Sequence, residues 1–156
     1  MARVPITRAG YEKLKNELQR LQKEERPAVI KAIEEARGHG DLSENAEYEA
    51  AKDKQGIIEG KIQETTDRLQ NSEIVDLPQD VDGKVVFGCK VVLEDLETGV
   101  VSSYRLVGPY EADVQEGTIS VTSPIGKALI GREEGDEVKV QAPKGIRNME
   151  ILEILA

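Results

Sequence analysis

Apolar residues in the first half of the chain recur with the period of an α-helix. Several are spaced at i, i+4 and i+7, which places them on one face of a helix. Thr7 is expected to be the N-cap of the first helix, with Ile6 and Tyr11 placed to pack against each other as a hydrophobic staple. The helix should therefore begin near Arg8. The apolar positions of this stripe are Leu14, Leu18 and Leu21, then Val29, Ile33 and Ala36, and finally Ile58, Ile62 and Leu69.

Two features interrupt the helical pattern. Pro27 removes a backbone hydrogen bond at a cost of about 3 kcal/mol, but the apolar spacing resumes directly after it. We therefore expect a bend near Glu25 to Pro27 and not a stop. The sequence GHGD at residues 38–41 is the only turn signal before Asn71 and lies near the midpoint of the pattern. It predicts an antiparallel helical hairpin with arms on the order of 45 Å long.

The second half of the chain changes to the alternating pattern of half-buried β-strands. Residues 124–130 form a short apolar stretch that predicts one or two helical turns ended by Gly131. We predict an α+β fold with an N-terminal α-helical coiled-coil hairpin (residues 1–76) and a small C-terminal antiparallel β-sheet domain with a short helix (residues 77–156). The alternating positions are Val85, Phe87, Cys89, Val91 and Leu93, then Val100, Ser102, Tyr104 and Leu106, then Val138 and Val140, and then Met149 and Ile151.

The composition favours a soluble, cytoplasmic protein. Charged residues make up 33% of the chain and aromatic residues 3%, so its cores must be built from aliphatic side chains. Cys89 is the single cysteine, which excludes an internal disulfide and suits a reducing compartment. The net charge of −9 disfavours general binding to nucleic acid, and residues 77–156 carry a larger share of it than residues 1–76.

Asp41 and Glu44 are the first candidates for chemistry. Their spacing matches a capping box, in which both acids satisfy backbone N–H groups at the start of the second helix. Capping does not explain why Glu47 and Glu49 add further negative charge near an exposed tip. Two carboxylates suit Mg²⁺, which usually takes one or two from a protein and its other ligands from water and phosphates. We interpret the tip as half of a metal site that another macromolecule completes, with the capping box as the alternative.

Two stretches of the sequence resemble signatures of the Gre family of bacterial transcript cleavage factors. Residues 36–48, with the sequence ARGHGDLSENAEY, resemble the tip signature of this family and of its GreA type in particular. Residues 119–125, ISVTSPI, followed by ALIG at 128–131, resemble the C-terminal signature of the family. The resemblance covers essentially the whole chain, with the motifs in the right order, which makes it far more specific than one short motif.

This resemblance implies a mechanism that depends on a partner. The hairpin would enter the secondary channel of RNA polymerase, where Asp41 and Glu44 would hold a catalytic Mg²⁺ jointly with the polymerase. The polymerase would then hydrolyse its own backtracked transcript. The C-terminal domain would be FKBP-like and dock near the channel mouth. The expected partners are RNA polymerase and the nascent RNA 3′ end inside its complex. We expect a monomer with no nuclease activity of its own, no Mg²⁺ in the free protein, no independent nucleic-acid binding and no membrane association.

The resemblance also implies roles for further residues. Arg37 and Lys52 match the family's basic patch, which contacts the transcript near its 3′ end, although basic residues on a helix exterior are commonly a solvated face. This patch is sparse, which suits the GreA type better than the more basic GreB type. Ser120, Ser123 and Pro124 match the docking signature, although a serine N-cap followed by proline is also ordinary at the start of a helix. The other tip residues are Gly38, His39, Gly40, Leu42, Ser43, Asn45 and Tyr48.

Two other functions remain open at this stage. One is a Gre-like inhibitor that occupies the secondary channel without stimulating cleavage, against which the intact acids Asp41 and Glu44 argue. The other is a plain coiled-coil interaction protein in which these acids only cap a helix. Binding to core RNA polymerase distinguishes the last possibility from the two Gre-like functions.

Overall fold

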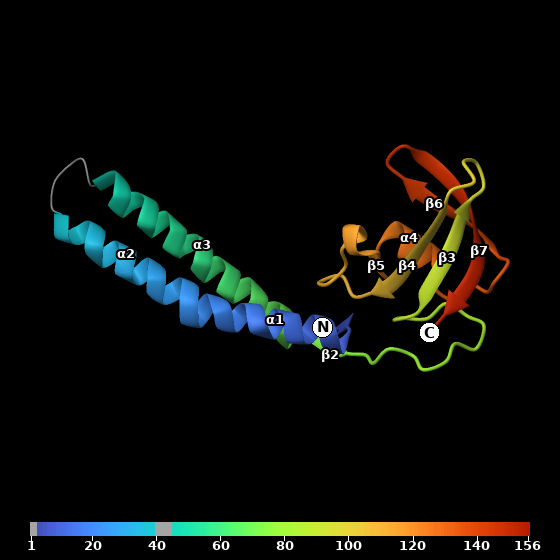
Figure 1. Cartoon of the computed structure of the whole chain (residues 1–156), viewed down its shortest axis with the longest axis horizontal. Coiled ribbons are helices and arrows are strands. Elements are labelled where there is room, and N and C mark those ends of the chain that lie inside the picture. The colour runs from blue at the N-terminus through green and yellow to red at the C-terminus, as the bar shows by residue number, and fades with distance from the viewer. Residues whose placement is uncertain (1–2, 40–44) are drawn as a thin grey trace. The chain divides into compact units, whose positions relative to one another are not determined.

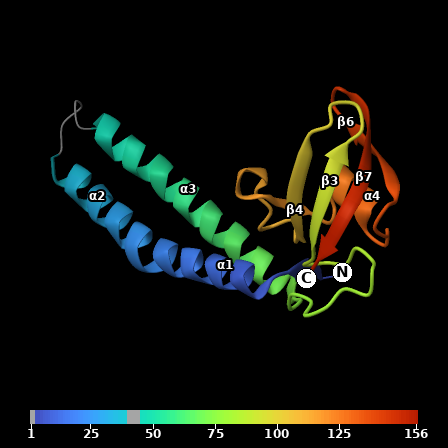
Figure 2. The same ribbon diagram turned by 45° about the vertical axis from the view of Figure 1, so that its right-hand side comes forward.

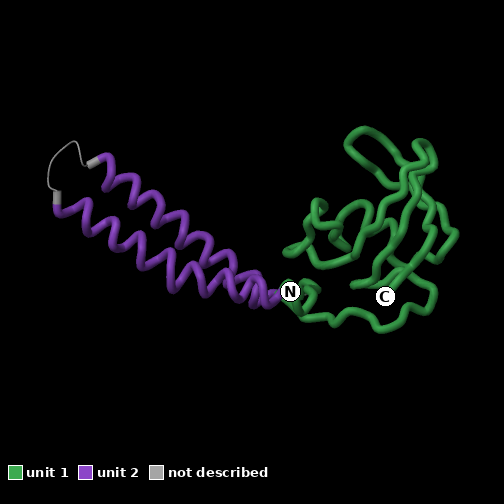
Figure 3. Tube along the Cα trace, viewed as in Figure 1, with its two compact units in different colours: residues 1–10, 72–156 green, residues 11–71 purple. Residues whose placement is uncertain are grey.

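The computed structural model of the protein describes residues 3–39 and 45–156 (Figure 1, with a second view in Figure 2). The chain divides into two compact units, shown in different colours in Figure 3. The helical unit is Tyr11–Asn71, and the β unit combines Met1–Gly10 with Ser72–Ala156. The start of the chain therefore belongs with the C-terminal residues, which the pattern of apolar positions alone does not reveal.

Helices in the first half follow the predicted hairpin. Helix α1 (Arg8–Arg20), a π-helical turn η1 (Leu21–Glu25) and α2 (Arg26–His39) form one arm, and α3 (Asn45–Gln70) runs alongside as the other (Figure 1). Thr7 is the N-cap as expected, since its Oγ1 accepts a hydrogen bond of 3.0 Å from the backbone N–H of Gly10. The buried cluster between the arms consists of Leu21, Val29, Ile58 and Ile62, with Leu18 partly buried beside it.

Pro27 does not end the first arm. The π-helical turn precedes it, and the backbone N–H of Arg26 bonds to the carbonyl of Leu21, five residues earlier. This wider turn relieves the clash that a proline ring makes with the carbonyl four residues before it in a regular α-helix. The arm changes direction between α1 and α2 without a stop, as predicted (Figure 2).

The β unit contains a five-stranded sheet with the order β5-β4-β3-β7-β6. Most of its pairs are antiparallel, as predicted, but β4 and β5 are parallel. They are parallel because the ten-residue connection, which includes the 3₁₀ turn η2 (Val114–Glu116), carries the chain back before β5 begins. The strands are β3 (Lys90–Asp95), β4 (Val101–Val107), β5 (Thr118–Ser120), β6 (Glu137–Ala142) and β7 (Gly145–Leu155).

Two further findings differ from the predicted strands. Val85, Phe87 and Cys89 precede β3, because Gly88 takes a positive φ of 87° that interrupts the extended backbone. Strand β1 (Val4–Ile6) pairs in parallel with β2 (Ser72–Ile74) in a separate two-stranded sheet. The short helix α4 (Pro124–Leu129) occurs where it was predicted.

The core of the β unit lies between the sheet and α4. Its aliphatic composition agrees with the scarcity of aromatic residues in the sequence. In the part of the chain that the structure describes, no helix is long and apolar enough to cross a membrane. The buried core residues are Val85, Cys89, Val91, Leu93, Leu106, Ile119, Leu129, Val138, Val140, Ile151 and Ile154.

Candidate functional site

The predicted tip lies at the connection between α2 and α3. Helix α2 ends at His39 and α3 begins at Asn45. The two candidate acids, Asp41 and Glu44, fall outside the described residues, as do Gly40, Leu42 and Ser43. Their assignment to a metal site therefore stays a prediction. In the described ranges 3–39 and 45–156, no group of three or more His, Cys, Asp or Glu side chains could hold a metal ion.

Gly38 is placed in the last turn of α2. A Cβ atom built at this residue meets no atom within 4 Å. Alanine would therefore fit here without displacing any described residue. Gly38 is thus not needed for packing in the free protein, and a helix without it would be stiffer.

Arg37 and Tyr48 bring the two arms together beside the tip. The guanidinium carbon of Arg37 lies 5.7 Å from the centre of the Tyr48 ring. A hydrogen bond from Arg37 to the hydroxyl, together with its positive charge, lowers the pKa of Tyr48 below the ordinary value. This contact joins α2 and α3 beside the tip, whereas any contact of Tyr48 with a partner stays a prediction.

Lys52 lies one turn further along α3. Its Nζ is 3.5 Å from Oε1 of Gln55, and its charge contributes the smallest of the effects that lower the pKa of Tyr48. Arg37 lies over the Tyr48 ring and Lys52 adds a second positive charge nearby, and this small cationic group can attract a phosphate. The contact between these residues and RNA stays a prediction.

The serines of the docking signature have structural roles of their own. Ser123 caps α4, because its Oγ accepts a hydrogen bond of 3.1 Å from the N–H of Gly126 and donates one of 2.6 Å to the carbonyl of Ser120. The hydroxyl groups of Ser120 and Thr122 are 2.7 Å apart. Pro124 occupies the first helical turn, where a missing N–H costs little. The capping role is confirmed, and contact with a partner stays a prediction.

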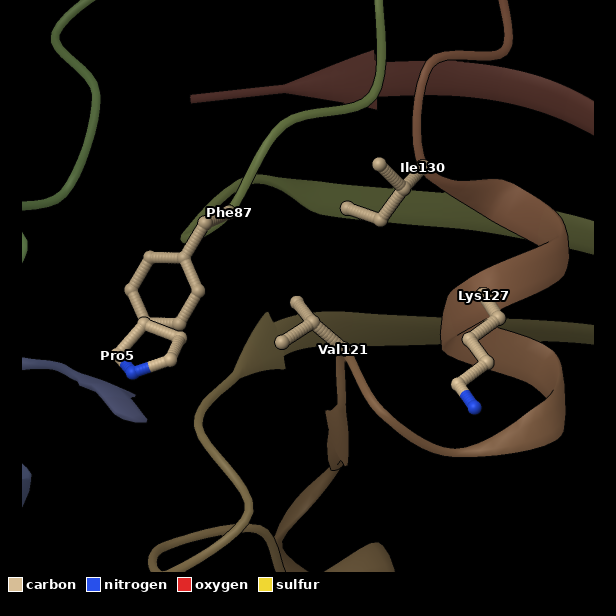
Figure 4. Close-up of a pocket in the computed structure, with 5 residues that line it drawn as sticks. All are labelled: Pro5, Phe87, Val121, Lys127 and Ile130. Atoms are coloured by element: carbon tan, nitrogen blue, oxygen red, sulfur yellow. The ribbon is translucent and has the colours of Figure 1, made fainter. Parts of the chain in front are cut away.

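An open apolar pocket lies next to this signature, and the sequence reasoning missed it. Its volume is about 420 Å³. Figure 4 shows Val121 and Ile130 extending toward the side where Phe87 and Pro5 lie, with Lys127 on α4. The signal that could have revealed it is the single phenylalanine of the chain, which the alternating pattern assigned to a strand. A pocket of this kind can take an apolar side chain of a partner protein.

Cys89 is excluded as a reactive group. Its side chain is buried, and this burial raises the pKa of the thiol. A thiol with a raised pKa forms little thiolate, so Cys89 acts as a small core residue, as expected from its place in the sequence.

Comparisons with known proteins agree on one family. The sequence profile described as "Transcription elongation factor, N-terminal" matches residues 4–74, and the profile "Transcription elongation factor, GreA/GreB, C-term" matches residues 79–156. A protein of Syntrophobacter fumaroxidans named transcription elongation factor GreA is 66% identical over 154 residues, covering 99% of each chain. The protein of the same name from Syntrophus aciditrophicus is 54% identical over 154 residues, covering 99% of this chain and 96% of the relative.

The solved structures include similar chains. The crystal structure of the Thermus thermophilus protein called GreA factor homolog 1 is 34% identical, covers 99% of both chains and superposes with a TM-score of 0.44.

Proposed function

Because the chain belongs to the GreA/GreB family of transcription elongation factors, we propose that it acts on RNA polymerase in backtracked complexes. Its hairpin tip enters the secondary channel and stimulates the polymerase's own hydrolysis of the extruded RNA, which rescues arrested complexes. The observation that carries the proposal is the place of Asp41 and Glu44 in the sequence. They fall within the five residues between the end of α2 and the start of α3, two long helices that run side by side.

The donor set of the tip fits magnesium. Two carboxylates supply hard oxygen ligands, and Mg²⁺ commonly takes only one or two of these from a protein. Asp41 and Glu44 would hold the ion jointly with ligands from the polymerase. When bound, the ion would stabilise the attacking and leaving oxygens of the hydrolysis. Because the ion's other ligands come from the polymerase, we propose that the free protein binds no Mg²⁺ tightly and cleaves no RNA.

The cationic group beside the tip would orient the transcript. The positive charges of Arg37 and Lys52 would attract phosphates of the RNA near its 3′ end. The contact between Arg37 and Tyr48 holds one of these charges in place before RNA arrives. Such preorganisation reduces the cost of ordering the side chain during binding. With only two such charges in an acidic protein, we propose no binding to free nucleic acid.

The β unit would dock on the polymerase near the channel mouth. Ser120, Ser123 and Pro124 shape the loop before α4, and the apolar pocket opens beside them. An apolar side chain of the polymerase would fill the pocket, with the cation of Lys127 available to an acidic neighbour. This docking would let the protein act as a monomer on one polymerase molecule.

The test uses polymerase complexes halted and backtracked on a template, with the transcript labelled at its 5′ end. Adding the protein together with Mg²⁺ should shorten the labelled transcript, whereas the protein with the free transcript should leave it intact. Binding to the complex without any shortening would favour the channel inhibitor. Absence of binding would leave the plain coiled-coil interaction protein.

A further inference from the structure

Two features in the middle of the hairpin's first arm depart from a regular α-helix. The arm passes through the π-helical turn Leu21–Glu25 and then reaches Pro27. Pro27 is exposed, so no packing contact with the second arm requires a proline there. π-helical turns inside long helices are rare and frequently occur at functional positions.

The second arm has its own weak points. Gly56 and Gly60 lie inside α3, and both are exposed. A Cβ atom built at either glycine meets no atom within 4 Å. Alanine would therefore fit at both positions, and glycine is the least favourable residue in a helix interior after proline. Close packing does not explain these two glycines.

These features lie at the same level of the hairpin. The guanidinium of Arg26, next to Pro27, donates two hydrogen bonds of 2.7 and 2.8 Å to the carboxylate of Glu59, next to Gly60. The π-helical turn and α3 share the buried cluster that includes Leu21 and Ile62. Both arms therefore depart from ideal helix formers at one place, across a shared apolar contact.

We propose that residues 21–27 and 56–60 form a joint about which the hairpin bends. The distal half, with α2 and the start of α3, changes direction relative to the half that contains α1. The buried cluster acts as the pivot, because nondirectional apolar contacts tolerate small rotations better than a network of hydrogen bonds does. The guanidinium of Arg20 pairs with Glu17 at 2.7 Å and with Glu25 at 2.5 Å, but these solvent-accessible ion pairs contribute little rigidity to the turn. The joint would let a long, thin hairpin adjust its direction while its tip stays intact.

The experiment measures bending in the free, full-length protein. Nitroxide labels are attached at Lys13→Cys and Glu34→Cys, two exposed positions of the first arm on either side of the joint, roughly 30 Å apart along the helix. The labelled protein should give a broad distribution of distances between the labels. The double change Gly56→Ala with Gly60→Ala should narrow it, and adding Pro27→Ala should narrow it further. Labelling of the parent protein controls for the buried Cys89.

Amide hydrogen exchange provides the second measurement. The double alanine variant should slow exchange about tenfold in residues 56–64, and less elsewhere. Asn16→Ala is the matched control, since it raises helix propensity at an exposed position of α1 away from the joint. A narrow distance distribution in the protein labelled at residues 13 and 34, unaltered by the glycine and proline changes, would overturn the proposal. The proposal would also be overturned if Asn16→Ala slowed amide exchange in residues 56–64 as much as the two glycine changes do.

This inference does not depend on the proposed action on polymerase. All of its measurements use the protein alone, and none of the substituted residues belongs to the tip or to the docking signature. Failure of transcript cleavage would leave the joint intact as a property of the hairpin. Failure of the bending test would leave the cleavage proposal unaffected.

Discussion

The two units of this protein are stabilised in different ways. Over the described residues, the main buried cluster of the β unit has eleven members, whereas that of the helical unit has four. Among the ion pairs of the helical unit are Arg20 with Glu17 and Arg26 with Glu59, whose side chains are exposed and contribute little each. The comparison shows that the predicted cleavage residues lie on the unit with the thinner core. We therefore expect exposed side chains there to be changed with little loss of stability, whereas the β unit should depend on its packing.

The largest loss of stability is expected when a buried side chain in the core of the β unit is shortened. Ile151 is fully buried and belongs to the core cluster of the β unit. Ile151→Ala should lower the free energy of unfolding by about 2 to 5 kcal/mol, because it removes buried methyl groups and leaves a cavity. Urea denaturation followed by circular dichroism measures the change.

The control for this deletion is Ile57→Ala in α3. Ile57 is 59% exposed, so the same chemical change should cost less than about 0.5 kcal/mol. Equal losses at both positions would show that the cost of the deletion does not come from burial in the core of the β unit.

A smaller loss of stability is expected when the contact between the start of the chain and the rest of the β unit is removed. The carboxylate of Glu111 accepts hydrogen bonds from the N–H of Thr7 at 2.8 Å, from the hydroxyl of Thr7, and from the N–H of Gly108 at 3.1 Å. Glu111→Ala should cost about 1 to 3 kcal/mol, because Thr7 is buried and loses its partner. Thermal unfolding would measure it, with Glu116→Ala, an exposed acid of the same connection, as the control. A loss no greater than that of the control would show that this contact does not fix the start of the chain.

The smallest expected change in stability is a loss in the helical unit at low pH. The hydrogen bonds from Arg26 lower the pKa of Glu59 below its ordinary value of 4.5. A carboxylate with a lowered pKa in the folded state stabilises that state above the unfolded pKa, and this contribution is lost as the pH falls through the folded value. The unfolding temperature of the helical unit should therefore decrease slightly below about pH 5. In the variant Arg26→Gln this decrease in unfolding temperature should be smaller. If the variant shows the same pH dependence as the parent protein, the ion pair between Arg26 and Glu59 is not the cause of the decrease.

The helical unit could be predicted more fully from the sequence than the β unit. Helical spacing depends on nearby residues, so Leu21, Val29 and Ile58 identified the buried face, and Thr7 identified the first cap. The π-helical turn was not predicted, because Pro27 shows that a helix must adjust but not how it does so. Sheet pairing joins residues far apart in the sequence, so the residues around Val4 do not indicate that it pairs with Ser72.

In the candidate site, too, the residues that form a continuous motif were predicted, and those that meet only in the fold were not. Asp41 and Glu44 were recognised from a continuous motif, and the caps around Ser123 were recognised from local chemistry. The pocket beside α4 was missed, because Pro5, Phe87 and Ile130 meet only in the folded β unit. Phe87 in particular was assigned to a strand, and the positive φ of Gly88 that interrupts this strand is not visible in an alternating pattern.

The most direct test of the account compares the protein with its Asp41→Asn variant. Asparagine caps a helix about as well as aspartate, so the variant should keep its helicity and its binding to polymerase. With Mg²⁺ and backtracked polymerase complexes, we expect shortening of a 5′-labelled transcript to slow by orders of magnitude in the variant. Equal cleavage by both proteins would show that Asp41 only caps a helix and would contradict the proposed role of the tip.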